Sequence, residues 1–410
     1  MLPNLSTRAV FSLTLAVAAA SGCTRYAAQA TSTATRPATR PARPPAAAPA
    51  SARDDFSSRA VADGQQIFRF DTFGDEQFWT DTLHLNEVVE QAVDPTTALQ
   101  VGLKVDADVL PAGILQKVDL KSPATTVALL KMNAIVGVRA ELDANNHIRR
   151  LGVTCALCHS TVDNSVMPGI GHRKDGWPNH DLNVGAIIAL SPVLPADAKA
   201  VYNSWGPGKY DPRFNIDGKN TPLVIPPAYG LGGVKNETYT AEGPISYWNA
   251  YVAVTQMHGH GDFADPRLGI AVRQAPDMVS PKLPALRAYQ HSIAAPAPPR
   301  GSFDAVMAGR GRAVFARSCA RCHEGASGTD NNNGKLHFPA ETGMNPDYAA
   351  RTANKAYRTT PLRALWQHAP YFHDGSARTL EDVVLHYDQS LRLGLTPRQQ
   401  QDLVEYLRSR

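Results

Sequence analysis

Apolar positions recur at helical spacing in several separated parts of this 410-residue chain. A helix is predicted over residues 125–142, because its apolar residues fall on one face of a 3.6-residue period. That face consists of Val127, Leu130, Ala134 and Val138. The same reasoning predicts helices over residues 244–258, 283–293 and 304–323. Residues 155–230 are rich in Gly, Pro and Asn and are predicted to be mainly loops.

The last predicted helix carries the clearest boundary signals. In "LTPRQQQDLVEYLRSR", Thr396 is placed to be the N-cap and Pro397 the first helical residue. Gln399 stands where a capping-box partner is needed. The apolar stripe of this helix consists of Leu403, Tyr406 and Leu407.

A further helix is predicted after Thr379, and its pattern gives one tyrosine a direction. Three apolar residues at i, i+3 and i+4 define one face, namely Leu380, Val383 and Val384. Tyr387, at i+7, lies in the middle of that face, whereas His386 lies about 100° away round the helix. Tyr387 is therefore predicted to point inward.

The N-terminus indicates export. A basic residue, an apolar run and "AASGC" make residues 1–23 resemble a bacterial lipoprotein signal, with Cys23 as the lipidated residue. A lipid-bearing N-terminus predicts a periplasmic protein anchored to a membrane. The alternative is ordinary cleavage nearby, for example after Ala30, which would give a product without lipid.

Composition limits the remaining possibilities. Residues 24–53 are nearly all Ala, Pro, Thr, Ser and Arg and are predicted to be a disordered linker. Lys and Arg number 41 against 37 Asp and Glu, and no dense basic block is present. Nucleic-acid binding is therefore not expected.

Four of the five cysteines repeat one motif. They form Cys155-Ala-Leu-Cys158-His159 and Cys319-Ala-Arg-Cys322-His323. A disulfide framework would not place a histidine after each second cysteine, and structural zinc would need four ligands at close spacing. A redox CxxC pair would explain one copy but not obviously both.

Covalent haem c explains every member of the motif, because two thioethers hold the haem and the adjacent histidine binds its iron. Two haem c groups are therefore predicted, on His159 and His323. The predicted fold is mainly α, with two loop-rich cytochrome c-like haem domains. Their predicted limits are 54–150 for an N-terminal helical extension, 151–298 for the first haem domain and 299–410 for the second.

Two stretches carry a family resemblance. Gly311 and Phe315 on neighbouring turns before the second motif resemble the first helix of class I cytochromes c. The segment 357–387, "YRTTPLRALWQHAPYFHDGSARTLEDVVLHY", resembles bacterial dihaem cytochrome c peroxidases and MauG-like enzymes. With the preceding haem motif, this resemblance covers about the last quarter of the chain.

The resemblance implies sixth ligands for both irons. Tyr387 stands where classical dihaem peroxidases have Met and MauG-like members have Tyr, so it is expected to bind the iron of His323. The alternatives there are His386, Met344 or no sixth ligand. At the first haem, "GIGH" makes His172 the expected distal and catalytic residue, with Met167 and His180 as rivals.

The resemblance also implies calcium between the haems. Asn179, Thr359 and Pro361 match the positions that bind it in the family, and oxygen ligands of this kind suit calcium. An aromatic electron relay between the haems is expected as well. Its candidates are Trp177, Trp205 and Trp248.

The predicted function is a peroxidase-type oxidoreductase, with peroxide chemistry at the haem of His159 and electron transfer through the haem of His323. Expected partners are hydrogen peroxide, a small electron-donor cytochrome or cupredoxin, and a small-molecule or protein substrate. The alternative is a membrane-tethered electron carrier without enzymatic activity, and a haem sensor is a third possibility. Residues 180–300 do not align cleanly with the family, and no distal acid–base residue is identified, although His258 and His260 are candidates.

Overall fold

The structure, a computed structural model, describes residues 56–323 and 325–410. It is mixed, with 41% helix and 11% strand, so the prediction of a mainly α chain is only partly confirmed. Within the described residues the strands form five two-stranded sheets, which connect stretches that the apolar periodicity did not predict to be strands. The predicted export signal (1–23) and linker (24–53) lie outside the described residues. Every helix among the described residues is too short or too polar to span a membrane.

Residues 299–410, called here the second haem segment after the haem predicted for them, are built on a close crossing of their first and last helices. Helix α11 (Ala305–Ser318) packs against α14 (Pro397–Arg408). At the crossing, a Cβ added to Gly311 would overlap the carbonyl oxygen of Asp402. One turn further, the rings of Phe315 and Tyr406 lie 5.0 Å apart. The glycine thus allows the helices to approach, and the aromatic pair fills the space beside it.

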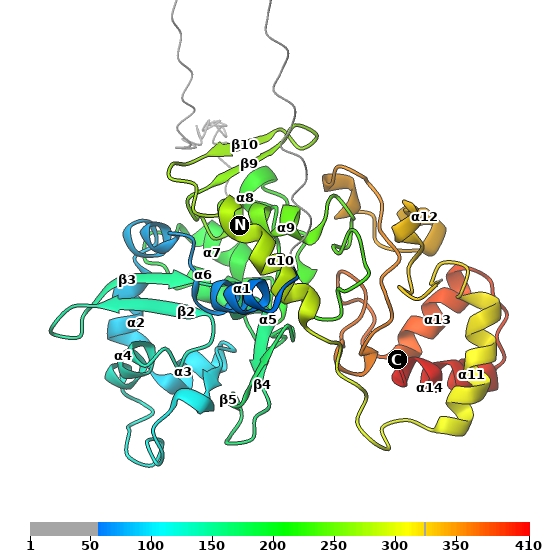
Figure 1. The fold of residues 1–410 in the computed structure, drawn as a ribbon, viewed down its shortest axis with the longest axis horizontal. Coiled ribbons are helices and arrows are strands. Elements are labelled where there is room, and N and C mark those ends of the chain that lie inside the picture. The colour runs from blue at the N-terminus through cyan, green and yellow to red at the C-terminus, as the bar shows by residue number, and fades with distance from the viewer. Residues whose placement is uncertain (1–55, 324) are drawn as a thin grey trace, which may run out of the picture. The chain divides into compact units, whose positions relative to one another are not determined.

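A matching crossing joins the predicted N-terminal extension to residues 151–298, which are called here the first haem segment after the haem predicted for them. Helix α1 (Ser58–Phe70) packs against α10 (Leu283–Ser292), as Figure 1 shows. A Cβ added to Gly64 would overlap the carbonyl oxygen of Ala285, and the rings of Phe68 and Tyr289 lie 5.5 Å apart. Each crossing therefore has the same pattern. One helix carries Gly-x-x-x-Phe, and the partner helix has a carbonyl that meets the glycine and, four residues later, an aromatic ring that meets the phenylalanine.

This repeat bears on the predicted N-terminal extension, residues 54–150. Helix α1 lies in that stretch and packs against α10 of the predicted first haem domain. Residues 71–154, between α1 and Cys155, are called here the insertion, and the limits of the domains stay predictions. The described residues all belong to one compact unit.

The insertion mixes helices and strands around an apolar core. Its elements are the π-helix η1 (Phe78–Thr82), α2 (Leu85–Ala92), α3 (Pro95–Gln100), β1 (Val105–Asp106), the 3-10 helix η2 (Ala107–Val109), α4 (Pro123–Lys131), β2 (Val138–Leu142) and β3 (Ile148–Val153). The predicted helix over 125–142 is wrong in its second half, because α4 ends at Lys131 and the chain enters β2. Asn133 and Gly137 adopt positive φ there, which breaks the helix.

The stretch that follows the first motif is irregular, as predicted, but short elements organise it. They are α5 (Ala156–His159), β4 (Ser160–Val162), β5 (Ile170–Gly171), β6 (Arg173–Asp175), α6 (Val184–Ala189), α7 (Ala196–Asn203), β7 (Lys209–Tyr210), α8 (Phe214–Asp217) and β8 (Leu223–Val224). Strand β4 pairs antiparallel with β6, β7 pairs antiparallel with β8, and β1 pairs in parallel with β5.

The remaining elements complete both segments. They are α9 (Ile245–Tyr251), the π-helix η3 (Val252–Gln256), β9 (Asp262–Asp265), β10 (Ile270–Arg273), the 3-10 helices η4 (Ser280–Lys282), η5 (Asp330–Asn333), η6 (Ala349–Arg351) and η7 (Leu365–Gln367), α12 (Pro339–Thr342) and α13 (Leu380–Ser390). The helices predicted over 244–258, 283–293 and 304–323, and those after Thr379 and Thr396, are all present in substance. The capping box of Thr396 and Gln399 is confirmed.

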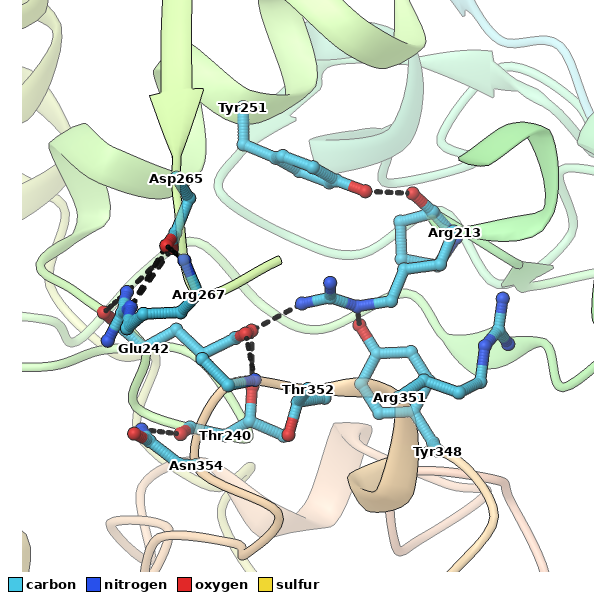
Figure 2. Close-up of polar contacts among 12 residues, drawn as sticks. Arg213, Thr240, Glu242, Tyr251, Asp265, Arg267, Tyr348, Arg351, Thr352 and Asn354 are labelled. Carbon is cyan, nitrogen blue, oxygen red and sulfur yellow. Dashed lines mark hydrogen bonds and ion pairs between the residues drawn. The ribbon is translucent and has the colours of Figure 1, made fainter. Parts of the chain in front are cut away.

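A buried ionic network joins residues 211–267 to residues 348–354 (Figure 2). Arg213 pairs with Glu242 at 2.5 Å, with both side chains almost fully buried. Arg351 pairs with Asp211 and Asp217, each at 2.8 Å. Buried charges are tolerated only when paired, so these partners fix how the first and second haem segments meet.

Candidate haem sites

The first motif presents two half-buried cysteines on one helical turn. Cys155 directly precedes α5 and Cys158 lies within it, and neither is in a disulfide. Burial raises the pKa of each thiol to about 12, so unreacted thiols would stay neutral. Two adjacent, unpaired, neutral thiols fit the attachment of haem c through thioethers.

The hydrogen bonding and the protonation state of His159 suit a metal ligand. Its Nδ1 lies 3.0 Å from the carbonyl oxygen of Pro226 and donates a hydrogen bond to it, which leaves Nε2 available. Pro226 follows β8, so the β7–β8 hairpin sets the orientation of the imidazole. Burial lowers the pKa of His159 to about 4, and the neutral ring that results is the form that binds iron.

The second motif repeats this arrangement at the end of α11. Cys319 caps the helix, and His323 follows with its ring centroid 6.0 Å from that of Phe315. Burial lowers the pKa of His323 to about 4. Its Nδ1 is buried without a hydrogen-bond partner among the described residues, unlike that of His159. The unreacted thiols and the neutral imidazole fit a second haem c.

Tyr387 lies where the helical pattern predicted. It belongs to α13 and shares the inward face with the buried Leu380 and Val384. Burial, and then its neighbours Cys319 and Cys322, raise the pKa of Tyr387. The structure thus brings the phenol toward the second pair of cysteines. Ligation of iron by Tyr387 stays a prediction.

The rivals of Tyr387 are directed elsewhere. The Nε2 of His386 lies 2.8 Å from the carbonyl oxygen of Thr342 and hydrogen-bonds to it. Met344 packs against an apolar cluster that includes Tyr348 and Tyr357. Neither side chain is free in this conformation to approach His323.

His172 lies on the outside of the hairpin that follows the first motif. Its side chain is 59% exposed, and its Nδ1 lies 2.6 Å from Oδ1 of Asp108. The hydrogen bond to Asp108 raises the pKa of His172. Binding of iron by His172 would require that it leave Asp108, and the distal role of His172 stays a prediction.

The other first-site candidates are also engaged. The Nε2 of His180 lies 3.2 Å from the carbonyl oxygen of Ile225, and Met167 packs into the apolar core of the insertion. His258 follows η3 and stacks on Phe78 of η1, with ring centroids 3.7 Å apart. Burial lowers the pKa of His258 to about 4, so it is neutral at pH 7.

A buried polar network beside the first motif was missed from the sequence. Tyr210 is a neighbour of Cys158, and its hydroxyl donates to Oε1 of Gln256 at 2.8 Å. Gln256 in turn donates to Oδ1 of Asn215 at 3.1 Å. Gln256 ends the π-helix η3, and π-helical turns often mark functional sites. No sequence motif flags these residues, because they come from three separate segments.

The predicted calcium ligands do not share a hydrogen bond in the described residues. Asn179 donates from its side chain to the carbonyl of Gly102 at 2.9 Å, and its Oδ1 is buried without a partner there. The carbonyl of Thr359, which a family-type site would use, accepts a hydrogen bond from Thr329 at 2.6 Å. The orphaned Asn179 oxygen suits a cation, but calcium and the role of Pro361 stay predictions.

One of the three candidate relay residues contacts the second haem segment. The ring of Trp177 lies 5.6 Å from that of Trp366, edge to face. Trp205 and Trp248 instead contact aromatic residues of the first segment. The structure therefore favours Trp177, and it adds Trp366, which the sequence analysis did not single out.

The cytochrome c family model matches residues 308–410, which contain the second motif. No curated protein matches the chain. Among solved structures, a hydrazine synthase of Kuenenia stuttgartiensis, pressurised with xenon, is 21% identical over 46% of this chain and 73% of that one, with a TM-score of 0.31. At that score the likeness carries no argument about this chain. Residues 308–410 are thus similar to a cytochrome c domain, which supports covalently bound haem c at the second motif and a redox function.

Proposed function

We propose that this protein is an exported dihaem c-type cytochrome that acts as a peroxidase-type oxidoreductase. Hydrogen peroxide is reduced at the haem of His159, and the haem of His323 stores or passes electrons. When bound, haem c supplies the redox-active iron for both tasks. The remaining roles belong to the chain's own residues.

The observation that carries the proposal is an asymmetry between the two sites. At the second site Tyr387 lies on the same face of α13 as Leu380 and Val384, which pack in one apolar cluster with Cys319. At the first site the ring nitrogens of His172 and His180 are engaged by Asp108 and by a backbone carbonyl. An open first site and a closed second site support a division into reactive and electron-transferring haems. A simple carrier would have both sites closed.

The surroundings of the first site support peroxide chemistry. Peroxide reduction requires groups that orient the substrate and move protons. Tyr210 and Gln256 provide a phenol and an amide in one hydrogen-bonded network, and neutral His258 lies two residues after Gln256. The Tyr210 hydroxyl donates to Oε1 of Gln256, and the Gln256 amide nitrogen donates to Asn215 and Thr255, so the network fixes the Tyr210 phenol in one orientation.

The contact between Trp177 and Trp366 supports cooperation between the two haems. Trp177 follows β6, one short hairpin after His159, and Trp366 lies in η7 of the second segment. Edge-to-face indoles at 5.6 Å form a short route for electron transfer across the junction. The Nε1 of Trp366 donates to the carbonyl of Pro296 at 3.4 Å, which orients that ring.

We further propose a periplasmic location, because haem c is attached outside the cytoplasm and the N-terminal sequence resembles a lipoprotein signal. The proposed electron donor is a small cytochrome or cupredoxin. MauG-like peroxide-driven oxidation of a protein or small molecule is the variant that the Tyr387 position favours, since a hard phenolate oxygen stabilises the ferric state.

The proposal is tested by adding hydrogen peroxide to the purified protein with both haems attached. A change in the Soret band, and turnover with a reduced small cytochrome c, are expected. EPR of the ferric protein is expected to show one high-spin and one low-spin haem. No spectral change and no turnover, even after partial reduction, would leave the electron-carrier function as the better explanation.

A further inference from the structure

Four aromatic side chains gather next to the first haem segment, away from the Trp177–Trp366 junction. The ring centroids of Tyr210 and Trp205 lie 5.3 Å apart, and those of Trp205 and Tyr202 lie 5.0 Å apart. Phe214 packs beside this row, 5.4 Å from Tyr202 and 6.0 Å from Trp205. All of these pairs are edge to face, the geometry that aromatic rings prefer.

The inner end of the row lies on the paired strands that orient the histidine of the first motif. Tyr210 lies in β7, whose partner β8 ends two residues before Pro226, and the carbonyl of Pro226 accepts the hydrogen bond from His159. The carbonyl of Gly208 accepts a hydrogen bond from the Ile225 amide at 2.9 Å, which locks the two strands together at that point. Tyr210 is thus held by the same hairpin that holds His159.

The outer end of the row reaches the surface. Trp205 is 4% exposed, whereas Tyr202 is partly exposed on α7, next to the exposed Asn203 and Ser204. The Nε1 of Trp205 donates to Oδ1 of Asn220 at 2.8 Å, so the indole is fixed between its two neighbours. The row therefore runs from the phenol of Tyr210, on the strands that orient His159, through the buried indole of Trp205 to the partly exposed phenol of Tyr202.

Tyrosine and tryptophan are the side chains that most readily give up one electron, and phenylalanine does so far less readily. We infer that Tyr202, Trp205 and Tyr210 form a second electron route, which lets the first haem oxidise phenol-bearing reductants too large to enter its site. These phenol-bearing reductants are oxidised at the surface around Tyr202. This inference rests on the proposed peroxidase function and adds a substrate class to it.

The electrons and protons balance with peroxide as the oxidant. Reduction of one H2O2 to two H2O takes two electrons and two protons. Two phenol groups at the surface each give one electron through the row and release one proton to solvent. Each phenol becomes a phenoxyl radical, and two such radicals couple through a new carbon–carbon bond. No covalent bond within the protein is formed or broken.

The test compares a large and a small phenol as reductants for the protein with both haems attached. The large probe is dextran carrying tyramine groups, and the small probe is free tyramine, each with hydrogen peroxide. Trp205→Phe keeps an aromatic ring but removes the oxidisable indole. Oxidation of tyramine–dextran is expected to fall at least about tenfold in this variant, while free tyramine and peroxide turnover with reduced cytochrome c change little.

Phe214→Leu is the matched control, because it disturbs the packing of the same cluster without removing an oxidisable ring. It is expected to leave tyramine–dextran oxidation nearly unchanged. A second readout is mass spectrometry after peroxide treatment without reductant, which is expected to find oxidative cross-links at Tyr202 in the wild type and none there in Trp205→Phe.

The outcomes separate the two proposals. Equal loss of dextran oxidation in Trp205→Phe and Phe214→Leu would mean that the cluster only supports packing, which overturns the inference. Turnover with cytochrome c but no modification of Tyr202 would also overturn it and leave the peroxidase function intact. Absence of all peroxide turnover in the wild type would overturn both.

Discussion

At the scale of single residues, Tyr387 is the clearest difference between the two predicted haem sites. It is inward-facing on α13 and neighbours Cys319 and Cys322, while its rival His386 is bonded to the Thr342 carbonyl. A phenol oxygen is a hard ligand that favours ferric iron, in contrast to a soft thioether.

Replacement of Tyr387 by Phe is therefore expected to change the low-spin EPR signal of the haem on His323 and to raise its midpoint potential. EPR and spectroelectrochemical titration measure these two effects. Tyr406→Phe is the control, because it removes a tyrosine hydroxyl at the α11–α14 crossing, where the ring packs on Phe315. An unchanged low-spin signal in Tyr387→Phe would show that another group, or none, is the sixth ligand.

His368 gives a pH dependence that does not involve iron. Burial lowers its pKa to about 4, and its Nε2 lies 3.0 Å from the hydroxyl of Tyr229. The folded protein keeps His368 neutral, whereas the unfolded chain protonates it near its ordinary pKa of about 6.5. Stability is therefore lost as the pH falls from about 6.5 toward 4, by roughly 1.4 kcal/mol per pH unit for this one proton.

His368→Gln is expected to reduce the slope of unfolding free energy against pH in that window by about one proton. Denaturant unfolding at several pH values between 7 and 4.5 measures the slope. Identical slopes in His368→Gln and the wild type would mean that His368 is protonated in the folded protein.

At the scale of elements, the two helix crossings share one chemical device. Gly64 and Gly311 each let a backbone carbonyl of the partner helix approach, and an aromatic pair fills the adjacent turn. The sequence carried this signal as Gly-x-x-x-Phe before each motif. It was recognised only before the second motif, because 84 residues separate Phe70 from Cys155 in the first.

Gly311→Ala is expected to destabilise the protein by about 1–3 kcal/mol, because the added methyl group meets the carbonyl of Asp402. Gly309→Ala is the control in the same helix, since nothing lies within 4 Å of its added Cβ. That change is expected to stabilise α11 by roughly 0.5–1 kcal/mol. Thermal unfolding of the two variants compares them, and equal effects would show that the crossing is looser than described.

At the scale of the whole molecule, the ionic network of Figure 2 holds the two haem segments together. Glu242 accepts hydrogen bonds from the Ala353 amide and from Thr240 besides its ion pair with Arg213. Burial of the pair leaves no water to replace a lost partner. The junction is therefore specific, and electron transfer across Trp177 and Trp366 depends on it.

Glu242→Gln removes one charge and strands the buried guanidinium of Arg213, so a loss of roughly 3–5 kcal/mol in unfolding free energy is expected. The double variant Glu242→Gln with Arg213→Met removes both charges and is expected to recover most of that loss. Chemical denaturation of the three proteins tests this. A double variant no more stable than the single one would show that the charge itself is not the cause.

How much the sequence predicted depended on whether a signal was local. The haem motifs, the capping box at Thr396 and the direction of Tyr387 follow from spacing within one or two helical turns, and such spacing acts wherever the chain goes. The helix over 125–142 failed in its second half because positive φ at Asn133 and Gly137 redirects the chain into a strand.

The sequence by itself therefore determined what the cysteines and histidines of the two motifs are suited to bind. The tertiary structure alone decided their surroundings: that α1 packs against α10, that Trp177 meets Trp366, that His172 faces Asp108, and that Tyr202, Trp205 and Tyr210 form one row. These relations join residues far apart in the chain. They depend on which loops and hairpins pack together, and periodicity within one element contains no information about that packing.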